Sequence, residues 1–265
     1  MGDDPPVTET AADALARLYD LDLSEDPGDL DLYLALAGQT GGPILELAVG
    51  SGRLAVPLAA AGYAVTGVDL DRAMLARARA TADSAGIATA RRLELVHADA
   101  REVRLPSAGS FQLAFVPLNS LFLMGTRADQ AAAVATLAAH LAPGALAVVD
   151  CWLPDAEDLA RYDGRVVLEW VREEPGTGRT VTKTGSATWD PTTSTVRLTT
   201  VFEAGDPGEP AVRWVRVDNL RLVSPDELVS MAEAAGLRVE ALAGDYDLGP
   251  LELGAERVVL LARRS

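Results

Sequence analysis

Apolar and polar positions follow two alternating rhythms along residues 44–149. Short apolar runs predict five strands, at residues 44–48, 63–68, 93–96, 111–116 and 145–149. Apolar residues at helical spacing predict helices between them, at residues 54–61, 71–84 and 127–141. Strands that alternate with helices through short connections are typical of βαβ units, and uniformly apolar strands suit a parallel sheet covered on both faces. The pattern therefore predicts an α/β fold.

The flanking segments follow other patterns. Helical spacing predicts short helices at residues 10–20 and 29–37, and the C-terminal part predicts a helix at 225–235 and strands at 237–242 and 257–262. After Pro154, four alternating β-rich segments are separated by turn-forming residues. These segments predict an antiparallel β-meander with strands at residues 165–171, 180–189, 195–203 and 212–223 and turns at 175–178, 190–191 and 205–208.

These patterns divide the chain into three expected parts. Residues 1–40 form an N-terminal helical cap. Residues 41–153 and 224–265 together form the α/β core. Residues 154–223 form an inserted antiparallel subdomain, which we expect to act as a lid or as a dimer contact.

Composition narrows the classes of partner. The 265 residues carry a formal net charge of −16, with acidic side chains concentrated in residues 1–31, whereas a nucleic-acid binder needs a basic footprint for phosphates. Cys151 is the only cysteine, which rules out an internal disulfide and a cysteine metal cluster, and we expect no metal site. The sequence shows neither a leader pattern nor an apolar run of membrane-spanning length, which favours a cytoplasmic protein.

The first candidate chemistry lies at the turn Gly50-Ser51-Gly52, between a predicted strand and helix. Glycine lets the backbone approach a ligand closely, and a helix N-terminus favours a carboxylate or phosphate. Asp69 closes the next strand about 20 residues later, the place of a ribose-binding acid, and Asp99 closes the third strand. Each acid alone is equally compatible with a helix cap or a loop. Together the three points share the carboxyl edge of one sheet, where such sheets bind ligands.

Residues 44–150 resemble the Rossmann-like class I S-adenosylmethionine-dependent methyltransferases. Five segments carry the likeness. They are Glu46-Leu47-Ala48-Val49-Gly50-Ser51-Gly52, with alanine at the first of three glycine positions, Val68-Asp69-Leu70, Met74, His97-Ala98-Asp99-Ala100, and Phe115-Val116-Pro117-Leu118-Asn119-Ser120. The resemblance implies a seven-stranded, mostly parallel sheet with helices on both faces and an antiparallel last strand.

The same resemblance implies S-adenosyl-L-methionine as the cofactor. Asp69 would bind the ribose, Asp99 the adenine amino group, and the residues around the glycine turn the methionine portion. The full set of implied cofactor contacts is Tyr33, Glu46, Ala48, Gly50, Gly52, Arg53, Asp69, Leu70, Met74, Asp99, Ala100 and Pro117.

Beyond residue 150 the chain is similar to glycine and amino-sugar N-methyltransferases, which insert β-strands after strand five. This implies a small-molecule acceptor, methylated on nitrogen, oxygen or a carboxylate. The candidates for acceptor contacts are Asn119, Trp152, Arg216 and Tyr246, with Arg221 as a further arginine of the meander. No general base is assigned, because His97 and His140 both suit structural roles. Methyl transfer needs mainly alignment and exclusion of water, since the sulfonium already carries an activated methyl group.

Two alternatives remain open on the sequence. A nicotinamide-dependent oxidoreductase uses a similar glycine turn and an acid like Asp69, but Asp99 favours the methyltransferase. A Tyr-x-x-x-Lys pair is also absent, because Arg179 stands four residues before Lys183, the only lysine. A non-catalytic S-adenosylmethionine-binding protein is the second alternative. A homodimer is also compatible with the sequence.

Overall fold

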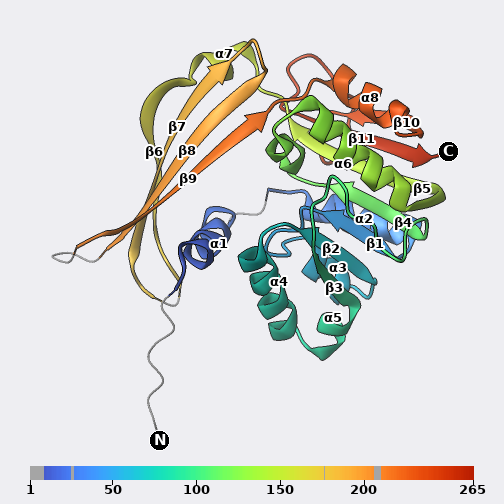
Figure 1. The fold of residues 1–265 in the computed structure, drawn as a ribbon, viewed down its shortest axis with the longest axis horizontal. Helices are drawn as coiled ribbons and strands as arrows, with labels where there is room; N and C mark the ends of the chain where they lie inside the picture. The colour runs from blue at the N-terminus through green and yellow to red at the C-terminus, as the bar shows by residue number, and fades with distance from the viewer. Residues whose placement is uncertain (1–8, 25–26, 176, 206–209) are drawn as a thin grey trace, which may run out of the picture.

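The structure is a computed structural model that describes residues 9–24, 27–175, 177–205 and 210–265. Part of the expected turns at 175–178 and 205–208, and the first acidic residues, Asp3 and Asp4, lie outside the described residues. The core is a seven-stranded sheet in the order β10-β11-β5-β4-β1-β2-β3 (Figure 1). Its strands are β1 Ile44–Leu47, β2 Val65–Asp69, β3 Leu93–His97, β4 Phe111–Val116, β5 Leu141–Trp152, β10 Leu237–Ala243 and β11 Arg257–Arg264.

The directions of these strands match the expected fold class. β1 to β5 pair in parallel, and β11 pairs antiparallel with both β5 and β10. The β1, β2 and β4 registers place the ends of neighbouring strands at one edge, because Leu47 lies beside Val68 and Glu46 beside Phe115. The predicted α/β sheet with an antiparallel last strand is therefore confirmed.

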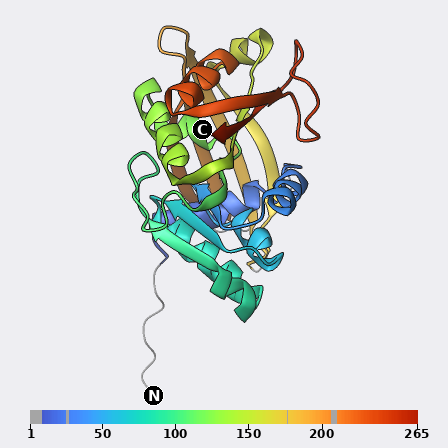
Figure 2. The same ribbon diagram turned by 90° about the vertical axis from the view of Figure 1, so that its right-hand side faces the viewer.

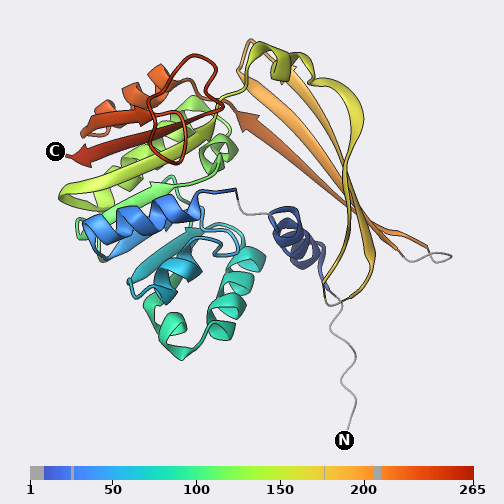
Figure 3. The same cartoon turned by 180° about the vertical axis from the view of Figure 1, so that it is seen from behind.

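Helices cover both faces of this sheet, as Figure 2 shows from the side. One apolar cluster packs α6 (Arg127–His140) and α8 (Pro225–Ala234) on the face seen in Figure 1. A second cluster packs α2 (Leu30–Thr40), α3 (Ala55–Ala60) and α4 (Arg72–Ser84) on the opposite face, which Figure 3 shows from behind. Strands buried on both faces have no polar side to display, which explains their uniform apolar runs.

The predicted meander is also present. Its strands are β6 Asp163–Glu173, β7 Thr180–Asp190, β8 Thr195–Gly205 and β9 Val212–Arg221, paired antiparallel in sequence order. α1 (Ala11–Asp22) lies between this sheet and the core in Figure 1. Its Leu18 and Leu21 pack against Val181 and Phe202 of the meander. At the end of α1, Asp22 accepts hydrogen bonds from Trp170 at 2.8 Å and Lys183 at 2.6 Å.

Three short helices were not predicted: α5 (Ile87–Arg92), the 3₁₀ helix η1 (Ser120–Met124) and α7 (Ala156–Ala160). Elements of five or six residues span less than two helical turns, so they give no periodic signal. β5 also begins at Leu141, four residues earlier than the predicted start at residue 145, and takes in Pro143 and Gly144. No helix in the described ranges has both the length and the apolar content needed to cross a membrane.

Candidate active site

The glycine turn joins β1 to α3 at the carboxyl edge of the sheet. Ala48, Gly50 and Gly52 all have positive φ, at 58°, 56° and 83°. A positive φ is unfavourable for residues that carry a Cβ atom. At Gly52 a Cβ atom would also lie only 3.0 Å from Val56 and 3.1 Å from Ala78. Close packing of α3 on α4 therefore requires glycine at position 52, while the turn leaves the backbone of Ala48 and Gly50 lining a cavity.

Asp69 ends β2 directly beside this turn. Its Oδ2 accepts a hydrogen bond from the Gly50 amide at 2.8 Å, and its Oδ1 accepts one from the Asp71 amide at 2.8 Å. Burial raises the pKa of the Asp69 carboxyl, although these two backbone amides act in the opposite direction. The carboxylate therefore holds the glycine turn against the start of α4 and still faces the cavity.

Asp99 follows β3 and lies near the same edge. Arg101 binds it through Nη2 at 2.5 Å and also reaches Asp129 at 3.0 Å. The Arg101 guanidinium holds the pKa of the Asp99 carboxyl below its usual range. Asp99, Ala100 and the sequence-predicted Leu70 line one cavity together with Arg101. Sequence reasoning missed Arg101, although its position two residues after the acid was available as a signal.

Glu46 and Arg53 flank the turn. Glu46 is buried, and the Arg53 side chain is half-buried. Burial raises the pKa of the Glu46 carboxyl well above its usual range. Arg53 forms a two-pronged ion pair with Asp29 at 2.5 and 2.6 Å. Burial alone would lower the pKa of the Arg53 guanidinium, but the Asp29 carboxylate raises it above its ordinary value. Asp29 was not among the predicted site residues. The contact expected between Arg53 and a methionine carboxylate stays a prediction.

The two N-terminal tyrosines occupy different environments. Tyr33 is fully buried on α2, with its ring 4.3 Å from that of Phe115, and it is absent from the linings of the cavities described here. Tyr19 of α1 lines the cavity beside Ala48, Gly50, Asp69 and Met74. Burial raises the pKa of both phenols. Tyr19 is therefore the tyrosine that borders the open site, whereas the sequence favoured Tyr33.

Two adjoining cavities follow the strand ends. One of about 370 Å³ is bounded by α1, the glycine turn, Met74 and Arg216, and one of about 250 Å³ by Leu70, Asp99 and Ala100. Both are lined by the same four residues, Ala48, Asp69, Ser120 and Leu123, so they form one continuous hollow. We call this hollow the strand-end cavity. It brings together residues from the turn after β1, the end of β2, the segment after β3, and η1, α1, α4 and β9.

The predicted acceptor residues are only partly brought together. Arg216 lines the strand-end cavity and pairs with Asp218 at 2.7 Å. Asn119 has a left-handed backbone, with φ 63°, and its Oδ1 accepts a hydrogen bond from the Trp152 amide at 2.5 Å. The Asn119 side chain thus bridges the ends of β4 and β5. The strand-end cavity is not lined by Asn119, Trp152 or Pro117.

Tyr246 belongs to a buried polar cluster behind these strand ends. Its hydroxyl donates to Asp150 at 2.8 Å, and Arg257 binds the same carboxylate at 2.7 Å. Asp150 also accepts a hydrogen bond from the Leu118 amide at 3.0 Å. Burial raises the pKa of the Asp150 carboxyl despite these partners. The cluster therefore holds the segment after β4 in place, and no sequence pattern indicated that Asp150 would lie at its centre.

Both histidines contact backbone groups, and neither lines the strand-end cavity. His140 is buried, with its Nε2 accepting from the Leu105 amide at 3.1 Å and its Nδ1 2.7 Å from the Thr136 carbonyl. His97 Nε2 lies 2.9 Å from the Leu70 carbonyl. These contacts agree with the structural roles expected from the sequence.

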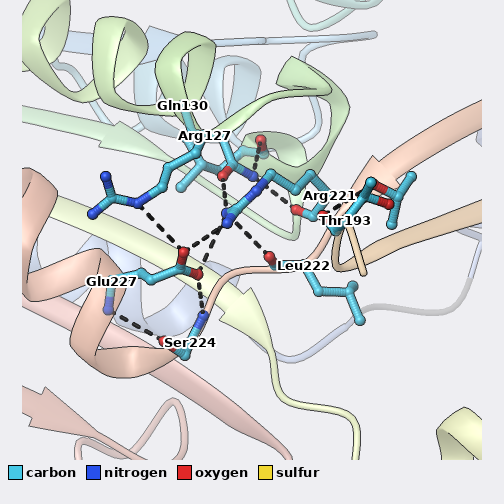
Figure 4. Close-up of polar contacts among 9 residues, drawn as sticks. Arg127, Gln130, Thr193, Arg221, Leu222, Ser224 and Glu227 are labelled. Atoms are coloured by element: carbon cyan, nitrogen blue, oxygen red, sulfur yellow. Dashed lines mark hydrogen bonds and ion pairs between the residues drawn. The ribbon is translucent and has the colours of Figure 1, made fainter. Parts of the chain in front are cut away.

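Another cavity, of about 590 Å³, lies elsewhere, where the meander meets the start of α6. Arg221 lines it, so this arginine is separated from the strand-end cavity that it was expected to serve. Arg221 donates to Gln130 at 2.8 Å and to Glu227 at 2.6 Å (Figure 4). Gln130 in turn donates to the Leu121 carbonyl at 3.2 Å. We assign the ligand site to the strand-end cavity, because parallel sheets bind ligands at their carboxyl ends.

Comparisons with known proteins agree with this geometry. Residues 44–144 match the family model described as a methyltransferase domain. A curated relative from Streptomyces venezuelae, dTDP-3-amino-3,4,6-trideoxy-alpha-D-glucopyranose N,N-dimethyltransferase, is 28% identical over 237 residues, which cover 86% of this chain and 92% of the relative.

Solved structures share the fold over nearly the whole chain. The CcbJ methyltransferase from Streptomyces caelestis has a TM-score of 0.76 at 22% identity and covers 91% of this chain and 98% of its own. S-adenosylmethionine-bound CalS10 from Micromonospora echinaspora, an amino pentose methyltransferase, has a TM-score of 0.66 at 23% identity. The match covers 99% of this chain and 100% of CalS10. Residues 44–144 are therefore a methyltransferase domain, the chain has the fold of the S-adenosylmethionine-dependent methyltransferases, and S-adenosylmethionine is the cofactor that this similarity indicates.

The residues present fit this cofactor. The continuous hollow presents the backbone of the glycine turn and the carboxylate of Asp69 to a common space. Within the described ranges, Tyr33 Oη and Glu46 Oε2 are buried without a hydrogen-bond partner. Such atoms destabilise the fold unless a ligand or water supplies the missing bond. Both side chains are buried and absent from the lining of the strand-end cavity, so the fit to the cofactor rests on the glycine turn and Asp69.

Proposed function

We propose that this enzyme transfers a methyl group to an amine nitrogen of a small-molecule acceptor. The observation that carries the proposal is the lining of the strand-end cavity. Its three acids are all engaged: Asp69 and Asp71 accept hydrogen bonds from backbone amides, and Asp99 is paired with Arg101, while neither histidine lines the cavity. A hydroxyl acceptor needs a base to remove its proton, whereas a neutral amine attacks through its own lone pair and loses a proton to water afterwards.

The names of the relatives support the same class of acceptor. The Streptomyces venezuelae relative is an N,N-dimethyltransferase of an amino sugar nucleotide, and it aligns across the core and the meander. The net charge of −16 disfavours a nucleic acid as the acceptor. An amine on a sugar-like metabolite is therefore the substrate class that we propose for this chain.

Each part of the cavity has a role in this proposal. The cofactor supplies an electrophilic methyl group on its sulfonium. Asp69 accepts hydrogen bonds from the ribose hydroxyls, Asp99 reaches the adenine amino group, and the turn at Ala48 and Gly50 holds the methionine portion. Alignment of acceptor and methyl group in a site closed to water contributes on the order of 7–11 kcal/mol to such reactions.

The acceptor enters between α1 and β9 in this proposal. Tyr19 and Arg216 border that side of the cavity. Arg216 is a donor for an anionic or hydroxyl-rich part of the acceptor. Asn119, through its bond to the Trp152 amide, holds the ends of β4 and β5, while Tyr246 acts through Asp150. Helix α1 and the meander then close the site above the core.

A substrate panel tests the proposal. Purified enzyme is incubated with methyl-labelled S-adenosylmethionine and with pairs of acceptors that differ only in an amino or a hydroxyl group at one carbon. We expect labelled product from the amino member of a pair and none from the hydroxyl member. Turnover of hydroxyl members alone would refute the amine assignment, and a greater thermal stabilisation by NAD than by S-adenosylhomocysteine would refute the cofactor site.

A further inference from the structure

The turn that joins β4 to η1 has a strained backbone. Leu118 and Asn119 both have positive φ, at 44° and 63°. This conformation is uncommon for residues other than glycine, and it is unfavourable for a side chain as bulky as leucine. Strained residues persist where their surroundings hold them, and they are found mainly at functional sites. The turn therefore requires a group that holds it in this conformation.

Asp150 binds both residues of this turn from β5, one residue beyond the last β5 residue that pairs with β4. Its Oδ2 accepts a hydrogen bond from the Leu118 amide at 3.0 Å, and its backbone carbonyl accepts one from the Asn119 amide at 3.1 Å. The Oδ1 of Asn119 in turn accepts a hydrogen bond from the Trp152 amide at 2.5 Å. Asp150 thus supplies the acceptors for both left-handed residues.

The Asp150 carboxylate is itself held at both of its oxygens. It is fully buried, and its Oδ1 binds the Arg257 guanidinium at 2.7 Å. Its Oδ2 also accepts a hydrogen bond from the Tyr246 hydroxyl at 2.8 Å. The guanidinium lies over the Tyr246 ring, 4.0 Å from the ring centre. A buried carboxylate bound to a charged partner and to two further donors has little freedom to move, so it is a rigid anchor for the turn.

The turn sets the position of η1, which forms one wall of the strand-end cavity. Ser120 and Leu123 of η1 line both parts of this cavity, as Asp69 does. The intervening Leu121 and Phe122 are buried in the core. A change in the backbone of the turn would therefore move Ser120 and Leu123 relative to Asp69.

We propose that Asp150, which does not line the strand-end cavity, is a positioning residue for methyl transfer. This inference rests on the proposed function, in which the ribose lies at Asp69 and the methionine portion at the glycine turn. Ser120 and Leu123 border both regions, so they lie where the two portions of the cofactor meet, at the sulfonium. Asp150 holds the turn, the turn places this wall, and the wall aligns the acceptor nitrogen with the methyl group. A displacement of about 1 Å can slow such a reaction about 100-fold.

Asp150→Asn tests the proposal, because it keeps the shape of the side chain and removes its charge. Asparagine offers a single acceptor oxygen, so either the Arg257 guanidinium or the Leu118 amide then faces another donor. We expect kcat, measured with the fastest acceptor of the substrate panel, to fall about 100-fold, and the affinity for S-adenosylhomocysteine to change much less. His140→Leu is the control, because it removes a buried hydrogen bond from the Leu105 amide that does not involve the turn. It should lower the free energy of unfolding and keep the wild-type kcat.

Rescue by glycine distinguishes positioning from a loss of stability. Glycine adopts positive φ without strain, so Leu118→Gly makes the turn less dependent on Asp150. We expect Leu118→Gly to raise the kcat of Asp150→Asn about tenfold, whereas Leu118→Gly alone should give no gain. If Asp150 only stabilised the fold, the two effects would be additive, and the double variant would be no faster than Asp150→Asn.

Hydrogen exchange at residues 118–124 tests the hold on the turn without any acceptor. With S-adenosylhomocysteine bound, these amides should exchange faster in Asp150→Asn than in the wild type, and His140→Leu should not change their exchange. Turnover of hydroxyl acceptors alone would refute the amine assignment, and the same comparison of kcat would then be made with those acceptors. A wild-type kcat in Asp150→Asn, an equal loss in His140→Leu, no rescue by glycine, or unchanged exchange at residues 118–124 would each overturn the role of Asp150.

Discussion

Replacing Asp69 by asparagine separates its two roles. The carboxylate accepts hydrogen bonds from Gly50 and Asp71, each at 2.8 Å, and it borders the strand-end cavity. Asparagine keeps one acceptor oxygen, so one ribose hydroxyl loses a charged partner. Hydrogen bonds to charged groups contribute about 1.5–3 kcal/mol, which corresponds to a loss of about 10- to 150-fold in cofactor affinity. One backbone amide also loses its acceptor, and we expect a lower free energy of unfolding.

Titration calorimetry with S-adenosylhomocysteine measures this effect on protein kept below its thermal transition. Asp83→Asn, at an exposed position of α4, is the control and should bind as the wild type does. A ligand that lacks both ribose hydroxyls completes the cycle and should bind equally well to wild type and Asp69→Asn. An unchanged affinity for the natural ligand would refute the ribose contact. An equal loss with both ligands would show that Asp69 acts only by holding the glycine turn.

Two further predictions concern buried groups. Burial raises the pKa of Glu46, so its contribution to stability declines as pH rises above about 4.3, the unfolded value. Glu46→Gln should therefore raise the free energy of unfolding in urea at pH 8 and change it little at pH 4, and the reverse order would contradict the burial argument. Arg221→Lys loses the fork that reaches both Gln130 and Glu227, and it should lower the free energy of unfolding by about 1–3 kcal/mol. Arg213→Lys, at an exposed ion pair, should change it by about 0–1 kcal/mol, and equal losses would disprove the role of the buried fork.

Local signals in the sequence were enough to predict the sheet and the centre of the site. An apolar run, a glycine turn and an acid at a strand end can each be recognised from a few neighbouring residues. In the structure, the Gly50 amide donates a hydrogen bond to Asp69. The partner of Arg53 was not predictable in this way. Asp29 lies 24 residues away, among many similar acids, and only tertiary packing selects it.

The tyrosines show a second limit of the sequence. Tyr19 and Tyr33 both lie on short N-terminal helices, and a few apolar positions do not fix how each helix is rotated against its neighbours. The structure turns Tyr33 onto Phe115 and leaves Tyr19 beside the cavity. Short elements such as η1, which supplies Ser120 and Leu123 to the site, were not predicted, because they are too short to show a periodic pattern of apolar residues.

The meander enters and leaves the core at one end of its own sheet. Asp163, at its start, pairs with Thr188, and Arg221, at its end, pairs with Thr195 on the neighbouring strand. A whole segment can therefore be exchanged between two junctions at the same end of the meander, while the three strands that end at Leu47, Asp69 and His97 stay intact. In evolution or in chimaera design, such an arrangement lets selectivity for the methylated compound diverge without rebuilding the nucleoside pocket.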